Sequence, residues 1–253
     1  MRLGLNFTPP HETPEEWADI LIERGYRAAS FPVNYKAPAH VIDAYVKAAA
    51  ERDIMIAEVG IWNSPHHPDP EQAALAREAC LEQLRLAEYI GAECCVNVSG
   101  AAGPAWYGCY MENYSRRLYQ ENVEFIRDLC DRVKPKNTCY ALESMQWMLP
   151  DSPEQYFQFI KDVDRDGFKV HMDMVNFIRD PYLYTHQEEL AGRTFGLLGK
   201  DIRSCHLKDC LMEDGTTVVI HEVPAGEGGV DLGMYLNHIK ALDREVPVSY
   251  THL

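Results

Sequence analysis

The stretch Ser204-Cys205-His206-Leu207-Lys208-Asp209 has the pattern of a buried strand, beginning near Ile202, that gives way to a polar loop. It brings an imidazole, an ammonium and a carboxylate within four residues. Two earlier apolar runs end in the same way, at Glu143 and at Asp173. These ends are 30 and 33 residues apart, which is about the length of one strand, one helix and two loops. The sequence therefore predicts repeated β-loop-α units.

Repeated units of this length build parallel sheets, and a closed barrel gathers the carboxyl ends of all its strands on one face. The chain has 253 residues, of which 46% are hydrophobic, so it is long enough for one (β/α)8 TIM barrel. No linker or low-complexity segment interrupts the order of elements, and we expect a single domain over 1–253. Seven units are followed by the start of an eighth strand at Val246–Val248. The barrel is thus expected to lack its last helix and most of its eighth strand.

A closed barrel would bring together Glu143, Asp173 and His206, although they are far apart in the sequence. Two carboxylates and one imidazole suit a divalent ion such as Mn²⁺, Mg²⁺, Co²⁺ or Zn²⁺, with coordination positions left for a substrate. The sequence therefore predicts one divalent metal site at the carboxyl ends of the strands.

Charge and cysteine content narrow the class of partner. A net charge of −15 and a pI near 5.0 disfavour nucleic acid and acidic membrane surfaces, because phosphates are bound mainly by clustered Lys and Arg. A small sugar or polyol fits better, and a homo-oligomer is compatible with the composition. The eight cysteines lie mostly within predicted strands and helices, without a CxxC pair. There is no signal-peptide pattern, so we expect a cytoplasmic protein.

Several polar and aromatic residues are predicted to surround the mouth of the barrel. The loop 60–70 and the Gly-rich loop 99–109 contribute aromatic side chains, and the second matches no phosphate-binding motif. Trp62 and Trp106 are equally compatible with loop packing and with stacking on a sugar. The adjacent His66 and His67 are interpreted as a loop feature that at most contacts substrate. The candidate substrate-binding residues are Asn6, Glu58, Trp62, His66, Asn97 and Asn176.

Four segments resemble one known family: Ala141–Glu143, Met172–Asn176, Cys205–Asp209, and Glu222–Gly228 followed by Asp231 and Tyr235. Together they are similar to the xylose-isomerase-like TIM-barrel superfamily, over nearly the whole chain. That family contains sugar isomerases and epimerases, inosose isomerases and dehydratases, hydroxypyruvate isomerases and endonuclease IV. The resemblance implies a TIM barrel and a role in carbohydrate metabolism.

The resemblance implies four metal ligands, Glu, Asp, His and Glu, from strands five to eight. The first three correspond to Glu143, Asp173 and His206. Thr251 stands where the fourth carboxylate belongs. The residues 248–253 also coincide with one reading frame of a common sequencing adapter (GTC TCT TAT ACA CAT CTG). We therefore expect the native sequence to differ after Pro247, and the chain as given to bind metal weakly.

The resemblance also implies a mechanism: isomerisation or epimerisation of a small sugar or keto-polyol by proton transfer through a metal-stabilised enediolate. Glu143 would be both ligand and base, with the absent strand-eight Glu as its partner. Lys208 would neutralise developing oxyanion charge, or would instead pair with Asp209. His171 is predicted to share a face with Asp173, as a supporting partner or as an ordinary barrel histidine. Hydrogen bonds to substrate hydroxyls are assigned to Asn176, Glu58, His66 and Asn97.

Three alternatives remain. The same metal and base can expel a β-hydroxyl, as in inosose dehydratases. Loss of the fourth carboxylate would also suit a barrel that binds a sugar or a partner protein without catalysis. Endonuclease IV chemistry is the least favoured, because Asn176 stands where one of its additional His ligands would be and the chain is acidic.

Overall fold

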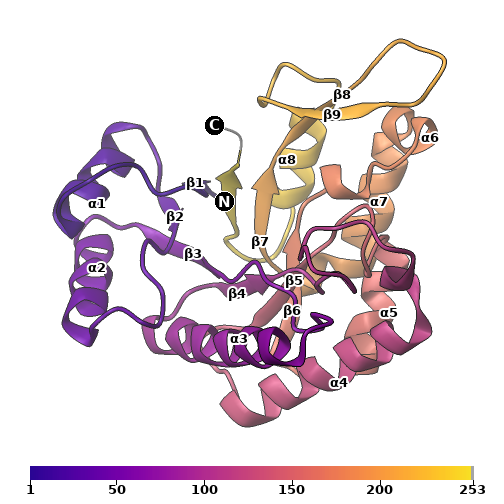
Figure 1. The fold of residues 1–253 in the computed structure, drawn as a ribbon. Helices are drawn as coiled ribbons and strands as arrows, with labels where there is room; N and C mark the ends of the chain where they lie inside the picture. The colour runs from indigo at the N-terminus through magenta and orange to yellow at the C-terminus, as the bar shows by residue number, and fades with distance from the viewer. Residues whose placement is uncertain (252–253) are drawn as a thin grey trace.

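The computed structural model describes residues 1–251, and within them eight parallel strands close into a barrel (Figure 1). The strand order around the barrel is β1-β10-β7-β6-β5-β4-β3-β2, so each barrel strand lies beside the barrel strands that precede and follow it in the chain, and β10 pairs with β1 to close the barrel. The predicted TIM barrel is confirmed. The barrel strands are β1 (Arg2–Leu5), β2 (Ala28–Ser30), β3 (Met55–Gly60), β4 (Cys94–Asn97), β5 (Tyr140–Glu143), β6 (Phe168–Met172), β7 (Ile202–Leu207) and β10 (Pro247–Tyr250).

Helices follow the strands and pack on the outside of the barrel (Figure 1). Their starts obey simple capping rules: Thr13, Asp69, Ser115 and Ser152 each accept a hydrogen bond from a backbone N–H of the first turn, and a proline opens three of these four helices. The helices are α1 (Pro14–Glu23), α2 (Ala39–Glu51), α3 (Pro70–Ile90), α4 (Arg116–Val133), α5 (Pro153–Val163), α6 (Pro181–Thr185), α7 (Gln187–Leu198) and α8 (Leu232–Lys240).

The eighth strand, β10, closes the barrel between the first and the seventh (Figure 1). Ser249 is aligned with Gly4 on one side and with His206 on the other. A side chain at Gly4 would meet Ser249 Oγ at 2.8 Å, so glycine allows this close approach. The strand has four residues, as many as β1. The end of the predicted adapter-derived tail, at 252–253, lies outside the described residues.

Two segments outside the barrel strands complete the fold. Ser115 is extended and caps α4, so a 3₁₀ turn, Met111–Tyr114, precedes that helix and is separated from it. After β7 the chain forms an antiparallel hairpin of β8 (Asp209–Met212) and β9 (Ile220–Val223), which lies outside the barrel (Figure 1). The hairpin begins at Asp209, so Lys208 is the single residue between the barrel strand β7 and the hairpin.

The core has one large apolar cluster, of which Trp17, Tyr156 and Phe168 are fully buried members, and two smaller clusters. This packing holds the strand ends at fixed positions. In residues 1–251 no helix has both the length and the continuous apolar character that a bilayer-spanning segment requires.

Candidate metal centre

Glu143, Asp173 and His206 meet at the carboxyl ends of β5, β6 and β7, and all three are buried. One ligand atom from each lies within 4.8 Å of the other two. In both Glu143 and Asp173, one carboxylate oxygen accepts a local hydrogen bond and the other faces His206. Asp173 Oδ1 accepts from the backbone N–H of Val175, and Glu143 Oε1 accepts from the amide of Asn176. Asp173 Oδ2 and Glu143 Oε2 face His206.

The distances around His206 are those of a ligand set rather than of a hydrogen-bond network. Its Nδ1 lies 3.4 Å from Glu143 Oε2 and 3.7 Å from Asp173 Oδ2. Hydrogen bonds from nitrogen to oxygen are about 2.7–3.2 Å long. Two ligands on a four-coordinate ion with bonds near 2.0–2.1 Å lie about 3.3 Å apart. Neither nitrogen of His206 has a hydrogen-bond partner, so this donor set fits a divalent cation.

Lys208 completes the charged group. Its Nζ lies 2.9 Å from Asp173 Oδ2, 3.4 Å from Glu143 Oε1 and 3.6 Å from Glu222 Oε2. It does not pair with Asp209, which turns away and accepts backbone N–H groups of the hairpin and the loop that follows. The alternative Lys208–Asp209 pairing is therefore wrong, because Asp209 is used to hold that loop.

Burial and charge oppose each other in this group. Burial works to raise the pKa of Glu143, but the attraction of His206 and Lys208 outweighs it and lowers that pKa. Burial works to lower the pKa of His206, whereas the facing carboxylates of Glu143 and Glu58 raise it well above its ordinary value. The buried carboxylates thus attract positive charge strongly, which favours a cation among them.

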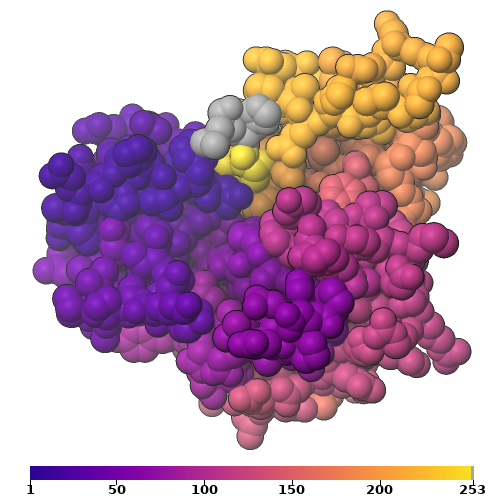
Figure 2. Space-filling model, in the orientation of Figure 1, coloured from indigo at the N-terminus to yellow at the C-terminus, as the bar shows by residue number. Residues whose placement is uncertain are grey.

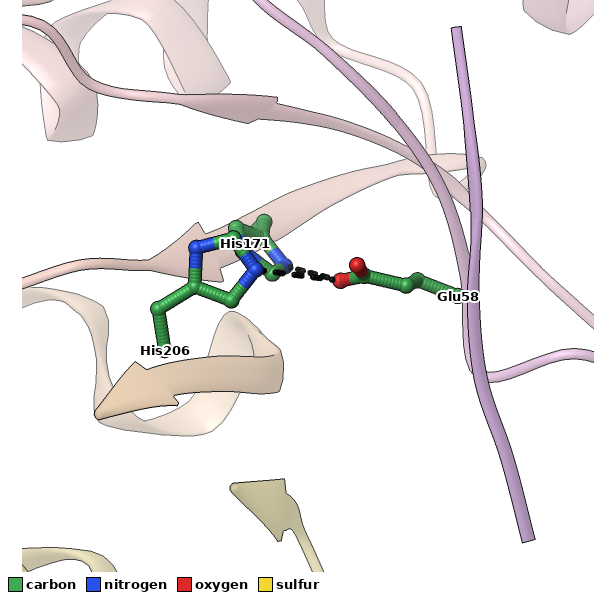
Figure 3. A group of neighbouring side chains, drawn as sticks. All are labelled: Glu58, His171 and His206. Carbon is green, nitrogen blue, oxygen red and sulfur yellow. Dashed lines mark ion pairs between the residues drawn. The ribbon is translucent and has the colours of Figure 1, made fainter. Parts of the chain in front are cut away.

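A second group lies on the other side of His206 (Figure 3). Glu58 Oε2, from β3, is 3.5 Å from His206 Nε2 and 3.4 Å from His171 Nδ1. The two imidazole rings are almost perpendicular, with centroids 4.1 Å apart. Burial lowers the pKa of His171 to about 4, and repulsion from His206 adds to this effect. His171 is therefore neutral over the physiological pH range.

A cavity of about 230 Å³ opens beside the centre. One wall is apolar or aromatic and the other carries charged groups. In the space-filling view, the N-terminal segments (indigo) and the hairpin region (orange) lie on opposite sides of the yellow end of β10 (Figure 2). The described residues that line the cavity are Asn6, Trp62, Val98, Trp106, Glu143, Met145, His206, Lys208, Glu222 and Thr251.

The structure thus brings most of the predicted site residues together. Trp62, Trp106 and Asn6 line the cavity, and Asn176 contacts Glu143. Glu58 was also predicted to bind substrate, but it faces His171 and His206 instead of lining the cavity. Two further predicted substrate-binding residues do not line it either. His66 is buried against Phe125 of α4, and Asn97 is fully buried and hydrogen-bonded to Asn63. Asn97 holds the loop after β3 through its hydrogen bonds to Asn63, and His66 packs that loop against α4.

Sequence reasoning did not anticipate the joint placement of Glu58, His171 and His206. The signal was present, because Glu58 stands near the end of the third strand as Glu143 stands at the end of the fifth. Glu222 was quoted only as part of a motif, yet it lies at the cavity beside Lys208. Its position depends on where the second arm of the hairpin, β9, lies relative to the barrel.

The sequence profile of the xylose isomerase-like TIM barrel family matches residues 18–251. The chain belongs to this family. Its expected membership is confirmed, and Thr251, the last matched residue, lines the cavity at the end of β10. No curated protein sequence matches the chain.

Solved structures of xylose isomerase-like barrels have the same fold. A xylose isomerase-like TIM barrel protein from Mycobacterium smegmatis in complex with magnesium has a TM-score of 0.70 and 16% identity, covering 98% of this chain and 89% of its own. D-psicose 3-epimerase with D-tagatose from Clostridium cellulolyticum H10 has a TM-score of 0.72 and 13% identity, covering 99% and 84%. The probable 3-DHS dehydratase AsbF from Bacillus anthracis has a TM-score of 0.74 and 15% identity, covering 98% and 92%.

Proposed function

We propose that the protein is a metal-dependent isomerase or epimerase of a small sugar or keto-polyol. The observation that carries the proposal is the meeting of Glu143, Asp173 and His206 beside a cavity of about 230 Å³. These residues would hold one divalent ion, for which Mn²⁺ and Mg²⁺ are the first candidates. When bound, the ion would stabilise negative charge that develops on substrate oxygens. The epimerase among the similar structures supports this reaction class.

The residues of the chain have distinct roles in this proposal. Glu143 removes a proton from the carbon next to the substrate carbonyl and, in an isomerisation, returns it to the neighbouring carbon. Epimerisation also needs an acid on the opposite face, which is the role of the strand-eight carboxylate that the family resemblance implies. Asn176 holds Glu143 Oε1 through a 2.8 Å hydrogen bond, so the carboxylate is oriented before the substrate arrives. Lys208, which faces the same cavity, stabilises the oxygen that gains charge during proton transfer.

The cavity favours a substrate without phosphate. Among the described residues that line it, Lys208 is the only Lys or Arg. Its ammonium group already contacts three carboxylates, those of Glu143, Asp173 and Glu222. A phosphate there would therefore be repelled by the carboxylates of Glu143 and Glu222, which line the same cavity. Trp62 and Trp106, with ring centroids 6.3 Å apart, form an apolar wall that suits the C–H face of an uncharged sugar.

A dehydratase is the second candidate, and the similarity to AsbF supports it. The first proton transfer is the same in both reactions. They differ in whether the proton returns to carbon or a β-hydroxyl leaves as water.

The eight cysteines are all unpaired, which supports the proposed location in the reducing cytoplasm.

Incubation with Mn²⁺ and a panel of ketoses and inososes in D₂O tests the proposal. Solvent deuterium at the α-carbon without loss of water would support the isomerase or epimerase, and loss of water would support the dehydratase. Glu143→Gln should abolish exchange, whereas the matched change Glu227→Gln at an exposed loop position should not. If no substrate exchanges, or if Glu143→Gln keeps full exchange, the assigned chemistry is wrong.

A further inference from the structure

Glu58 is a buried carboxylate that the proposed reaction does not use. Its exposed fraction is 1%, and it lies on β3, across the barrel from β6 and β7 (Figure 3). The Ser30 hydroxyl is 2.7 Å from Glu58 Oε1, so that oxygen has its partner and Oε2 remains directed at the two histidines. A fully buried carboxylate is costly unless its charge is compensated. The contact with His206 therefore calls for an explanation.

The two nitrogens of His206 face different partners. Nδ1 faces Glu143 and Asp173, whereas Nε2 faces Glu58 Oε2 at 3.5 Å. An imidazole that binds a cation through one nitrogen carries its proton on the other, and a carboxylate that accepts this proton fixes the tautomer and the ring orientation. Glu58 Oε2 is the oxygen that faces Nε2; at 3.5 Å it lies about 0.3 Å beyond the hydrogen-bond range, so a small approach would make it this acceptor. The perpendicular ring of His171 packs against His206 and limits its rotation.

We propose that Glu58 is a positioning residue that accepts a hydrogen bond from Nε2–H of His206 and directs the Nδ1 lone pair toward Glu143 and Asp173. This inference rests on the proposed cation site. Glu58 would not itself be a ligand of a further ion, because His171 Nδ1 already has the Ser204 hydroxyl as its partner. In addition, neither Glu58 nor His171 lines the cavity through which an ion would enter.

Titration of the protein with Mn²⁺, followed by the electron paramagnetic resonance of the free ion, tests the inference. Glu58→Gln keeps the size of the side chain but removes its charge and offers Nε2–H only a weaker amide acceptor, and it should weaken Mn²⁺ binding roughly 10- to 100-fold. Asp201→Asn is the matched control: Asp201 is equally buried and pairs with Lys169, but it precedes β7 at the opposite end. Its Mn²⁺ affinity should stay within about twofold of the unmodified protein.

Nitrogen-15 spectra of the histidines in the Zn²⁺-loaded protein supply a second measurement. They should show His206 with its proton on Nε2, which a merely structural role of Glu58 would not require. If Glu58→Gln does not fold, Ser30→Ala is the substitute, since it removes the partner of Oε1 and should weaken Mn²⁺ binding by several-fold or more.

Three results would overturn the inference. Unchanged Mn²⁺ affinity in folded Glu58→Gln would show that the contact is structural. Two ions per chain, falling to one in Glu58→Gln, would make Glu58 a direct ligand. If the unmodified protein does not bind Mn²⁺, the proposed cation site on which the inference rests is wrong as well. Weaker Mn²⁺ binding in Glu58→Gln would support the inference even if no sugar exchanges, so the two proposals can fail separately.

Discussion

At the scale of single residues, the decisive position is Thr251. It lines the cavity with Glu143 and His206, and its hydroxyl has no hydrogen-bond partner. A carboxylate here would complete the ligand set that the family resemblance implies. We expect Thr251→Glu to tighten Mn²⁺ binding at least about tenfold, which corresponds to about 1.4 kcal/mol. Isothermal titration calorimetry of both proteins would measure the change in Mn²⁺ affinity.

The control for this change is Thr216→Glu, which adds the same charge at an exposed position between β8 and β9. It should leave Mn²⁺ affinity nearly unchanged. Equal gains in both variants would mean that added negative charge, rather than a ligand at the cavity, strengthens binding. No gain in Thr251→Glu would count against the assignment of this position.

His66 gives a prediction about pH. Burial lowers its pKa to about 4 from an ordinary 6.5, and its side chain is 2% exposed. Folding therefore keeps His66 neutral while the unfolded chain becomes protonated below pH 6.5. The stabilisation is complete above pH 6.5 and is lost as the pH falls toward 4, by at most about 3 kcal/mol.

His66→Gln stays neutral throughout this range, so its free energy of unfolding should fall less between pH 7 and pH 4.5 than that of the unmodified protein. Urea unfolding at both pH values would measure the difference. Comparison at pH 8, where both side chains are neutral, separates the packing cost of the substitution. Parallel pH profiles for the two proteins would contradict the prediction.

At the scale of elements, the hairpin β8–β9 depends on one carboxylate. Asp209 is buried and accepts four backbone N–H groups, from Cys210, Gly226, Gly228 and Val230. Three of these belong to the loop that leads from the hairpin to α8. A Cβ atom at Gly228 would lie 2.2 Å from Asp209 Oδ1. Residue 228 must therefore be glycine for the loop to come this close to the carboxylate. Asp209 thereby holds the loop that follows β9, the strand that places Glu222 at the cavity.

Removing this carboxylate should loosen the loop. Asp209→Ala leaves several N–H groups without partners, and an unsatisfied buried group costs about 1–3 kcal/mol, so we expect a loss of roughly 3 kcal/mol in the free energy of unfolding. Asp209→Asn keeps one acceptor oxygen and should lose about half as much. Urea unfolding would give the energies, and hydrogen exchange at 226–230 would locate the change. Slow exchange there in Asp209→Ala would refute this role.

The elements also show how far the sequence predicts the structure. The strand ends at Glu143, Asp173 and His206 were found because a parallel barrel forces consecutive strand ends to one face. The places of His66 and Asn97 were not found, because a side chain in a loop can turn to either side and no periodicity records which. To predict the second group, Glu58 with His171 and His206, one would need the orientations of the two imidazole rings. These orientations depend on packing across the barrel.

At the scale of the whole molecule, the candidate centre joins β5, β6 and β7 to each other, while Glu58 extends the contact to β3. A cation bound there would connect strands from distant parts of the sequence, and it would bind only the folded chain. Binding to the folded state alone stabilises a protein by about 2.7 kcal/mol when the free ligand is at 100 times its Kd.

For a chain of this length, each kcal/mol raises Tm by about 2–4 °C, so Mn²⁺ at that concentration should raise Tm by roughly 5–10 °C. Differential scanning calorimetry with Mn²⁺ or with excess EDTA would measure the shift. Glu143→Gln should lose most of it, because the amide is a weaker ligand and carries no charge. Glu227→Gln should keep it, since that carboxylate is exposed and outside the centre. An equal shift in both variants would mean that the ion stabilises the barrel from some other site, and the Glu143, Asp173 and His206 centre would then have no part in it.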